Sequence, residues 1–566
     1  MTEVTFSPNA APQGLARRGH GRLAWTLFAA VLALLIAAPL LAVLANLGRP
    51  TQGVFAHLAA TVLPEMLLNT VLLLLGVGLG SALIGVGCAW AVTMIEFPGR
   101  RLLSWLLFLP LAIPGYVSAF VYGELMQFAG PVQTALRQTF GWSRGDYWFP
   151  DVMTLGGVTA LLTLAFYPYV YMLARAAFQD QSVCVLEVGR TLGIRPWGRF
   201  WRIALPLARP MIAGGIALVL METLAEFGAV SYFGVPTFTT AIYRTWFGMG
   251  NPVAAAQLAG MLMLFVLGAV MLERISRQAK RFHHTSARTR PLKLHRPTPL
   301  LAGLTLLLCA LPVLLGFLLP AGRLLYLAIT EGDSLGSARL LGFALNSFML
   351  SGLAALLLVG LGLLLAYAQR LAPGRLLSWL GQFATMGYAV PGSVIAIGIL
   401  LPLASLDHTL NTWMQRLFGH APGLLLSGTL LALLYAYVVR FMAVTHSTMD
   451  GGLHRIRPSL DQAARVLGES PFGVVRRVHA PLLRGSLFTA ALLAFVDVLK
   501  ELPATLIVRP FDFDTLAVRV YQLSSDERLS EASTGALIIV AAGLLPVLWL
   551  NAALAGSRPG QEQDTP

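Results

Sequence analysis

Long runs of apolar residues, separated by short polar segments, occupy nearly the whole chain of 566 residues. A helix needs about 20 apolar residues to cross a bilayer, where backbone groups must find hydrogen-bond partners within the helix. The alternating pattern of a membrane β-barrel is absent from the sequence. We therefore predict an all-α integral membrane protein with about twelve transmembrane helices, at residues 23–47, 67–94, 102–126, 155–178, 210–233, 254–273, 298–320, 344–368, 376–402, 422–446, 484–507 and 531–555.

The pattern in the first half of the chain recurs in the second half. FPGRRLLSWLLFLPLAIPG (97–115) is similar to APGRLLSWLGQFATMGYAVPG (372–392), and LLNT at Leu67 is similar to ALNS at Ala344. Matching segments lie about 275 residues apart, close to half the chain length. Each copy contains an even number of predicted helices, so both copies enter the membrane in the same orientation. The sequence predicts two parallel six-helix repeats.

Basic residues indicate how these repeats are oriented. Most of the 40 Lys and Arg residues, with Arg440 counted among them, fall on the same side as the N-terminus when the predicted helices alternate in direction. The positive-inside rule makes that side cytoplasmic and places both termini there. The predicted division is an N-terminal tail (1–22), a first permease repeat (23–273), a cytoplasmic linker (274–297), a second permease repeat (298–555) and a C-terminal tail (556–566).

Composition narrows the class of function. The chain is 56% hydrophobic and only 12% charged, which excludes an ordinary soluble domain. Its net charge of +14 is explained by the cytoplasmic loops, so we predict membrane lipid and no nucleic acid as a partner. The three cysteines are widely separated, and no nucleophile–base pair or Cys/His metal spacing is visible. We predict no catalytic residue, no certain metal ligand and no bound cofactor.

A basic segment lies between the fourth and fifth helices of each repeat. These segments are LEVGRTLGIRPWGRFWRIALPLARP (186–210) and DQAARVLGESPFGVVRRVHAPLLRG (461–485). In each of them a glycine is followed ten residues later by Ile or Val, and three residues after that by Pro. Glycine accepts the left-handed conformation that ends a helix, and Pro196 suits the first turn of the next one. We predict two short surface helices joined by a glycine; a surface elbow without a partner is the alternative.

These segments resemble the EAA loop of ATP-binding-cassette importer permeases, which has the pattern E-A-A-x3-G-x9-I-x-L-P. The resemblance implies a transport subunit, not an enzyme, with the fold of a type I ATP-binding-cassette importer. It also implies that the aligned residues dock in a groove of a cytoplasmic ATPase, expected as a homodimer. Val188 and Gly189 replace the two alanines, Gln462 replaces the acid and Ala480 replaces leucine. The residues predicted to dock the ATPase are Glu187, Gly193, Ile203, Pro206, Gln462, Gly468, Val478 and Pro481.

ATP itself is expected on a partner chain. The sequence contains three lysines, Lys280, Lys293 and Lys500, and none of them follows a glycine. A phosphate-binding loop of the form G-x4-G-K-[ST] is therefore absent.

The stretches that follow the two loops resemble the ferric-iron importer permeases, in which two copies are fused. These stretches are 225–259 and 497–533, and the second contains KELPATLIVRPFDFDTLA. The resemblance implies Fe³⁺ transport across the bacterial inner membrane and a periplasmic substrate-binding protein that delivers the ion. Related fused permeases carry thiamine, phosphonate or other small solutes, which is the first alternative. A secondary transporter that works without ATP is the second.

Four carboxylates lie inside predicted spans, at matching positions of the two repeats. Carboxylates within a membrane are costly and indicate function. Within each pair the spacing is four residues, which places both side chains on one helix face. Oxygen donors near the axis between the repeats suit a hard trivalent cation. The predicted translocation pathway is formed by Glu222, Glu226, Asp497 and Glu501.

A structural function is the alternative for the same carboxylates. Lys500 is close enough in sequence to pair with Asp497 or Glu501, and Glu222 is placed to cap a helix break near Gly228. Pro503, at the matching place in the second repeat, predicts a break in the eleventh span.

Overall fold

The computed structural model describes residues 14–51, 53–143, 145–180, 196–278, 295–332 and 337–556. Nine helices of this part are long and apolar enough to cross a membrane. Two bent helix pairs and the shorter apolar helix Pro252–Gly268 lie where the remaining three spans were predicted. Within the same residues no β-sheet is formed, because the β-type pairing is one isolated bridge between Ile95 and His295. The prediction of an all-α membrane protein is confirmed.

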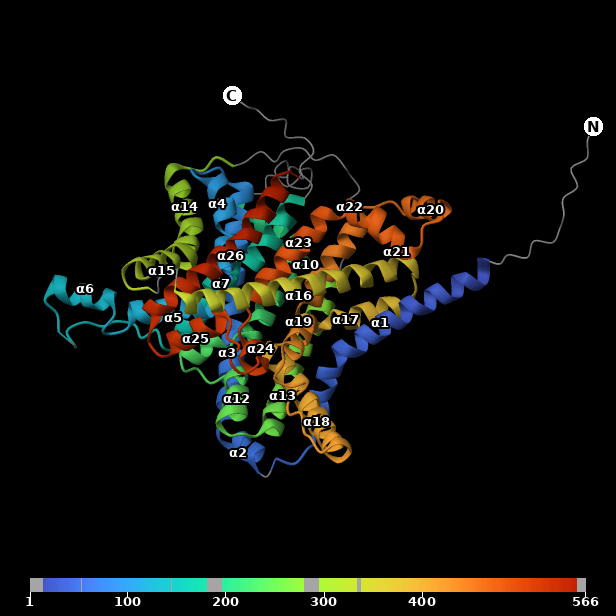
Figure 1. Ribbon diagram of the computed structural model, residues 1–566. Coiled ribbons are helices and arrows are strands. Elements are labelled where there is room, and N and C mark those ends of the chain that lie inside the picture. The colour runs from blue at the N-terminus through green and yellow to red at the C-terminus, as the bar shows by residue number, and fades with distance from the viewer. Residues whose placement is uncertain are drawn as a thin grey trace, which may run out of the picture.

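The first repeat contains the elements α1 to α13 (Figure 1). They are α1 (Gly14–Ala45), α2 (Val54–Thr61), α3 (Leu63–Met94), α4 (Arg100–Leu106), α5 (Gly115–Met126), α6 (Pro131–Phe140), α7 (Leu155–Asp180), α9 (Pro196–Arg199), α10 (Leu205–Ala225), α11 (Gly228–Tyr232), α12 (Phe238–Tyr243) and α13 (Pro252–Gln278). Most residues of the predicted linker, and most residues of the two predicted tails, lie outside the described residues.

The second repeat contains the elements α14 to α26 in a matching order. They are α14 (Pro299–Val313), α15 (Leu319–Thr330), α16 (Ala338–Leu371), α17 (Arg375–Ala384), α18 (Gly392–Phe418), α19 (Leu430–His454), α20 (Pro458–Val466), α21 (Pro471–Val474), α22 (Ala480–Leu482), α23 (Arg484–Leu499), α24 (Pro503–Val508), α25 (Leu516–Ser525) and α26 (Leu529–Gly556).

Equivalent hydrogen bonds show that the sequence repeat is also a structural repeat. Asn69 of the LLNT segment donates from Nδ2 to the carbonyl oxygen of Pro236, at 3.2 Å. Asn346 of the ALNS segment donates in the same way to Asp514, also at 3.2 Å. The two acceptors directly precede the threonines that start α12 and α25. The asparagines therefore hold the same loop in the same place in both copies.

The third predicted span, 102–126, is not one straight helix. Ile113 is extended just before Pro114, and the helical segments on its two sides meet at 91°. Proline lacks an N–H group and pushes the residue before it out of the helical conformation, which explains the bend. Val390 and Pro391 interrupt the second repeat in the same way, between α17 and α18. A second bend, of 84°, separates α22 from α23.

The helices of the two repeats are interleaved in space. Helix α1 packs against α16, α17, α18 and α19, which all belong to the second repeat. In return α14 packs against α3 and α4, and α15 packs against α5. The largest buried apolar cluster contains residues of both repeats, among them Ile36, Phe120, Leu358 and Tyr437. The first helix of each sequence repeat is therefore buried against the opposite repeat.

Figure 1 shows that loops predicted on opposite sides of the membrane lie at opposite ends of the molecule. Helices α4, α20 and α22 lie toward one end, and α2 and α12 lie toward the other. Helix α4 begins with two arginines, and α20 and α22 follow segments that contain two arginines each, whereas the second group follows segments with few basic residues. The arrangement agrees with the alternation of helix direction inferred from charge.

Candidate functional site

The helices that carry the four carboxylates are broken at the same place. Helix α10 ends at Ala225 and α11 begins at Gly228, while α23 ends at Leu499 and α24 begins at Pro503. The break predicted for the eleventh span is confirmed, and the fifth span has its counterpart. Between the breaks lies a cavity of about 110 Å³, which we call the central cavity. Both repeats line it, and its wall includes Glu222, Glu226, Asp497 and Glu501.

Glu226 and Glu501 cap the short helices that follow the two breaks. The Ala229 N–H donates to Glu226 Oε1 at 2.9 Å. The N–H groups of Ala504 and Thr505 donate to the two carboxylate oxygens of Glu501, at 2.8 and 2.9 Å. The first N–H groups of a helix have no partner within it and carry partial positive charge, so a carboxylate is stabilised there. The sequence had suggested Glu222 as the cap, and the structure assigns that role to Glu226 because Glu226 lies at the break itself.

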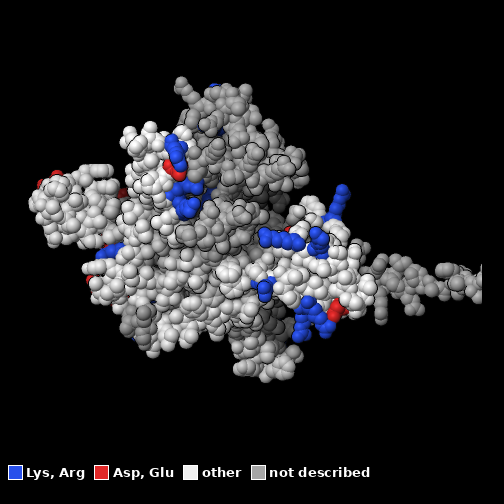
Figure 2. Space-filling model, turned by 90° about the horizontal axis from the view of Figure 1, so that it is seen from above, with Lys and Arg blue, Asp and Glu red and all other residues white. Residues whose placement is uncertain are grey.

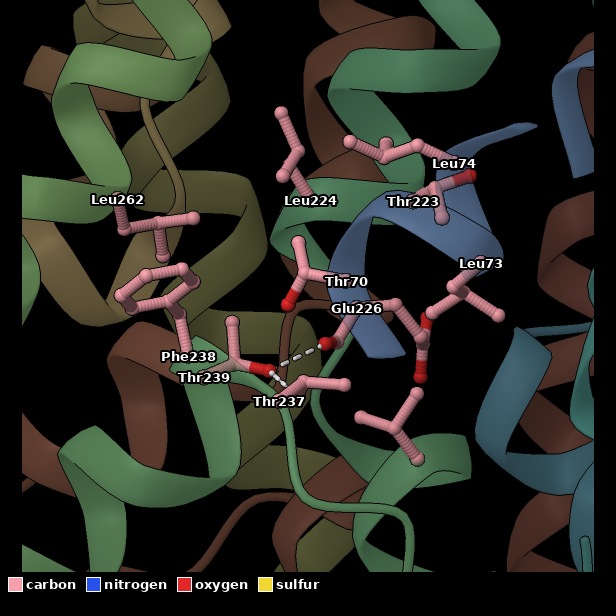
Figure 3. A pocket seen from close by; sticks show the side chains of 11 residues that line it. Thr70, Leu73, Leu74, Thr223, Leu224, Glu226, Thr237, Phe238, Thr239 and Leu262 are labelled. Carbon is pink, nitrogen blue, oxygen red and sulfur yellow. Dashed lines mark hydrogen bonds between the residues drawn. The ribbon is translucent and has the colours of Figure 1, made fainter. Parts of the chain in front are cut away.

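Figure 3 shows how the backbone at Glu226 is held. The Thr239 hydroxyl donates to the Glu226 carbonyl oxygen at 2.8 Å, and it also contacts the Thr237 hydroxyl at 3.0 Å. A small cavity of about 10 Å³ lies beside this carboxylate, with Thr70 in its wall. That volume is close to the smallest that accommodates one water molecule. The helix break in the first repeat is therefore supported by a set of threonines.

The other two carboxylates have side-chain partners. Lys500 Nζ lies 3.0 Å from Asp497 Oδ1, so the predicted Lys500–Asp497 pair is present. The Tyr388 hydroxyl donates to Glu222 Oε1 at 3.2 Å, and this contact joins the two repeats. Over the described ranges, no group of three or more His, Cys, Asp or Glu side chains is arranged to hold a metal ion. The four carboxylates face one cavity, but each is held separately.

Two glycines allow the carboxylates to approach the helix breaks. A Cβ atom on Gly392 would lie 2.7 Å from Glu501 Oε1 and 2.7 Å from Arg440 Nη1. A Cβ atom on Gly115 would lie 3.1 Å from Glu226 Oε2. The recurring Pro-Gly pairs therefore bend the chain and also leave room for a charged group beside it.

Sequence reasoning identified Lys500 but missed Arg440 and the phenolic groups of the central cavity. Arg440, which the charge count placed on the cytoplasmic side, lines the cavity, as do Tyr116, Tyr169 and Tyr388. Among described atoms, Arg440 Nη1 and the Tyr116 hydroxyl have no hydrogen-bond partner, and Tyr116 is 3% exposed. The position of Arg440 inside the predicted span 422–446 was the available signal, because charged residues within spans tend to face functional cavities.

The loop of the second repeat has the predicted helix–glycine–helix geometry. Helix α20 ends at Val466, Gly468 has a φ of 90°, and α21 begins at Pro471. Gln462 lies in α20, whereas Val478 and Pro481 lie in the turns that lead to α23. In the first repeat Pro196 begins α9 as predicted, Ile203 lies in the helical turn just before α10, and Pro206 lies in the first turn of α10. Glu187 and Gly193 lie outside the described residues.

Apolar side chains are exposed on this loop, which sequence reasoning did not identify. Val466 is 87% exposed, Leu467 is 84% exposed and Phe472 is 64% exposed. Figure 2 shows that basic side chains gather on this face of the molecule and that few acidic ones are visible there. We call Val466, Leu467 and Phe472 the loop patch. An exposed apolar surface with a charged rim is typical of a protein–protein contact.

A buried ion pair joins the loop to a long helix of the second repeat. Arg370, near the end of α16, donates to Asp461 Oδ2 at 2.7 Å and to the Ile456 carbonyl oxygen at 2.9 Å. The imidazole of His479 is fully buried and lies 3.0 Å from the other oxygen of Asp461. Breaking such a pair leaves an uncompensated charge, which costs about 3–5 kcal/mol. Movement of α20 is therefore coupled to α16.

Comparison with known proteins identifies the repeated unit. A family model described as the binding-protein-dependent transport system inner membrane component matches residues 81–280 and again residues 358–557. The second match repeats the first, which confirms the fused duplication.

Two relatives align with most of this chain, and a shorter one aligns with about a third of it. The Fe(3+)-transport system permease protein FbpB 2 of Haemophilus influenzae is 28% identical over 492 residues, which cover 86% of this chain and 89% of the relative. The putative ferric transport system permease protein FbpB 1 of that organism is 24% identical over 501 residues, which cover 84% and 75%. The molybdenum transport system permease protein ModB of Escherichia coli K12 is 31% identical over 204 residues, which cover 34% of this chain and 86% of that protein. This chain, a multi-pass permease of an ABC transport system, therefore belongs to the family of binding-protein-dependent transport system inner membrane components and carries two fused copies of its domain.

Proposed function

We propose that this chain is the permease subunit of an ATP-driven importer, and that it moves ferric iron across the bacterial inner membrane. The observation that carries the proposal is the central cavity, where both repeats contribute a pair of carboxylates at a helix break. Oxygen donors of this kind suit a hard trivalent cation. The names of the two ferric relatives support the same cargo. Thiamine, phosphonate or another small solute remains the alternative cargo.

In the proposed mechanism the energy enters through the two loops. A cytoplasmic ATPase on separate chains, expected as a homodimer, binds both loops and closes when it binds ATP. The second loop, which contains the docking residues Gln462, Gly468, Val478 and Pro481, moves with the ATPase. The Arg370–Asp461 contact transmits that movement to α16. The first loop acts in the same way through Glu187, Gly193, Ile203 and Pro206.

Movement of the loops then exposes the central cavity to alternate sides of the membrane. A periplasmic substrate-binding protein delivers the ion to the outward-facing state, and hydrolysis of ATP restores the inward-facing state. Both termini and the linker (274–297) lie on the cytoplasmic side in this proposal. Because helix α1 packs on the second repeat and α14 on the first, a movement of one repeat carries a helix of the other with it.

ATP depletion separates this mechanism from a secondary transporter. The cells tested express this chain together with the partner ATPase. We expect them to lose ferric iron uptake when ATP is depleted while the proton gradient is maintained. The control uses the same cells with ATP and a collapsed proton gradient, where uptake is expected to continue. Uptake that follows the proton gradient instead would establish a secondary transporter. Competition by thiamine or phosphonate, with no competition by Ga³⁺, would establish a different cargo.

The loop patch provides a test of ATPase docking. Leu467→Glu places a charge in a surface that is expected to be buried against the ATPase. Loss of one central interface contact costs about 2 kcal/mol, which predicts roughly thirtyfold weaker binding of the ATPase in a pull-down titration. Phe511→Glu is the matched control, because Phe511 is 86% exposed and lies between α24 and α25. Equal binding by both variants would remove the loop patch from the interface.

A further inference from the structure

The central cavity is built from matched positions, but its basic charges are not matched. Glu222 corresponds to Asp497, and Glu226 corresponds to Glu501, so both repeats contribute two acids. The residue before each cap differs: it is Ala225 in the first repeat and Lys500 in the second. Both residues line the cavity.

The same asymmetry exists for Arg440. Gly85 of the first repeat packs against the backbone nitrogen of Tyr171, and the matching Gly362 packs against that of His446. Tyr171 and His446 are therefore at matching positions of the two repeats. The residues six positions before them, Ala165 and Arg440, match as well, and both line the cavity. The second repeat therefore supplies two cations at positions where the first repeat has alanine.

Each cation lies beside a carboxylate of its own repeat. Lys500 Nζ is 3.0 Å from Asp497 Oδ1, and the two side chains are 30% and 22% exposed. Arg440 Nη1 and Glu501 Oε1 each lie 2.7 Å from the position that a Cβ on Gly392 would occupy, on the same side of the cavity, although Nη1 has no hydrogen-bond partner among the described atoms. The carboxylates of the first repeat have no basic residue at the corresponding positions.

We propose that Lys500 and Arg440 are tethered counter-ions of the cargo site, which keep weakly attracted cations out of the central cavity. This inference rests on the proposed function, because it takes the cavity as the cargo path. A free cation must displace an ammonium group that is tethered to the same helix and is present at high effective concentration. A monovalent ion gains about as much from the carboxylate as Lys500 does, whereas a trivalent ion gains about three times as much. The advantage of a free ion over the tethered group therefore rises with the charge of the ion.

An unpartnered hydroxyl in the cavity supports a ligand at this place. The Tyr116 side chain lines the central cavity between the two helix breaks and is almost fully buried. Its hydroxyl has no hydrogen-bond partner in the part of the chain that the structure describes. A buried polar group without a partner costs about 1–3 kcal/mol. The hydroxyl oxygen would gain a partner by accepting a hydrogen bond from the water shell of an incoming cation. A purely structural Lys500–Asp497 pair gives no reason for this open hydroxyl.

Binding of Tb³⁺ to the purified full chain tests the inference without the ATPase. Tyrosines of the cavity wall sensitise the luminescence of a bound lanthanide, and Ca²⁺ is then added as the competitor. In Lys500→Ala, which copies Ala225, we expect both ions to bind about tenfold more tightly, a larger effect than for a fully exposed ion pair because Lys500 and Asp497 are only partly exposed. Ala225→Lys places a second ammonium three residues after Glu222, and we expect both ions to bind about tenfold more weakly.

Two further variants separate failure of the inference from failure of the proposed function. Lys500→Arg keeps the charge and is expected to bind like the unmodified chain. Glu226→Gln with Glu501→Gln is expected to remove most of the luminescence. If the glutamine pair lowers binding while Lys500→Ala and Ala225→Lys leave both affinities unchanged, the proposal of tethered counter-ions is overturned and the proposed cargo site is retained. If the glutamine pair leaves binding unchanged, the cavity is not the cation site and both proposals fail.

Discussion

Ferric iron uptake is expected to fall by about a hundredfold when Glu226 and Glu501 are both replaced by glutamine. Each substitution removes a negative charge from the central cavity, and a charge-assisted contact contributes about 1.5–3 kcal/mol. The two reductions in uptake multiply, because the carboxylates belong to different repeats and cap different helices. Radiolabelled iron uptake into cells that also express the ATPase and the binding protein measures the effect.

The same double variant is expected to fold and to bind the ATPase. Glutamine keeps one oxygen, which accepts the N–H group of Ala229 in the first repeat and that of Ala504 in the second. The Thr505 N–H group loses the second oxygen of Glu501, so the second helix cap is weakened but not removed. Glu226→Ala with Glu501→Ala is the control for the caps, because it removes the acceptor as well as the charge. Loss of membrane-inserted protein only in the alanine variant separates the two effects. Unchanged uptake in the glutamine variant would reduce these carboxylates to structural caps.

Replacing Gly468 and Gly193 with valine is expected to uncouple ATP hydrolysis from transport, with uptake reduced at least about tenfold. Gly468 has a φ of 90°, and no atom lies within 4 Å of the position that a Cβ would occupy. The expected penalty is therefore conformational, about 1–2 kcal/mol or more for a left-handed residue with a side chain. The turn relaxes, and α21 loses its orientation relative to α20.

Steady-state ATP hydrolysis and iron uptake, measured on the same preparation, test the uncoupling. Hydrolysis is expected to continue because the double variant leaves the ATPase itself unchanged. Gly468→Asn is the matched control for the second loop, since asparagine tolerates the left-handed conformation, and its uptake is expected to stay near normal. Normal coupling in the double valine variant would show that these loops do not transmit the movement.

Features that depend on neighbours in the sequence were predicted correctly. The length of each apolar run set the membrane class, and the recurrence of LLNT as ALNS and of the two loops revealed the duplication. The Lys500–Asp497 pair and the break before Pro503 follow from residues within one or two helical turns. Such features are decided by helix periodicity and by the missing N–H group of proline, which are both visible in a short window of sequence.

The features that only the tertiary structure decided are contacts between residues far apart in the chain. The sequence of 102–126 indicates an interruption at Pro114, but the 91° angle depends on the helices around it. The exchange of α1 and α14 between the repeats, the entry of Arg440 into the central cavity and the Tyr388–Glu222 contact all join segments that are more than a hundred residues apart. An apolar helix face or a single charge is compatible with many partners, and packing of the whole molecule selects one of them.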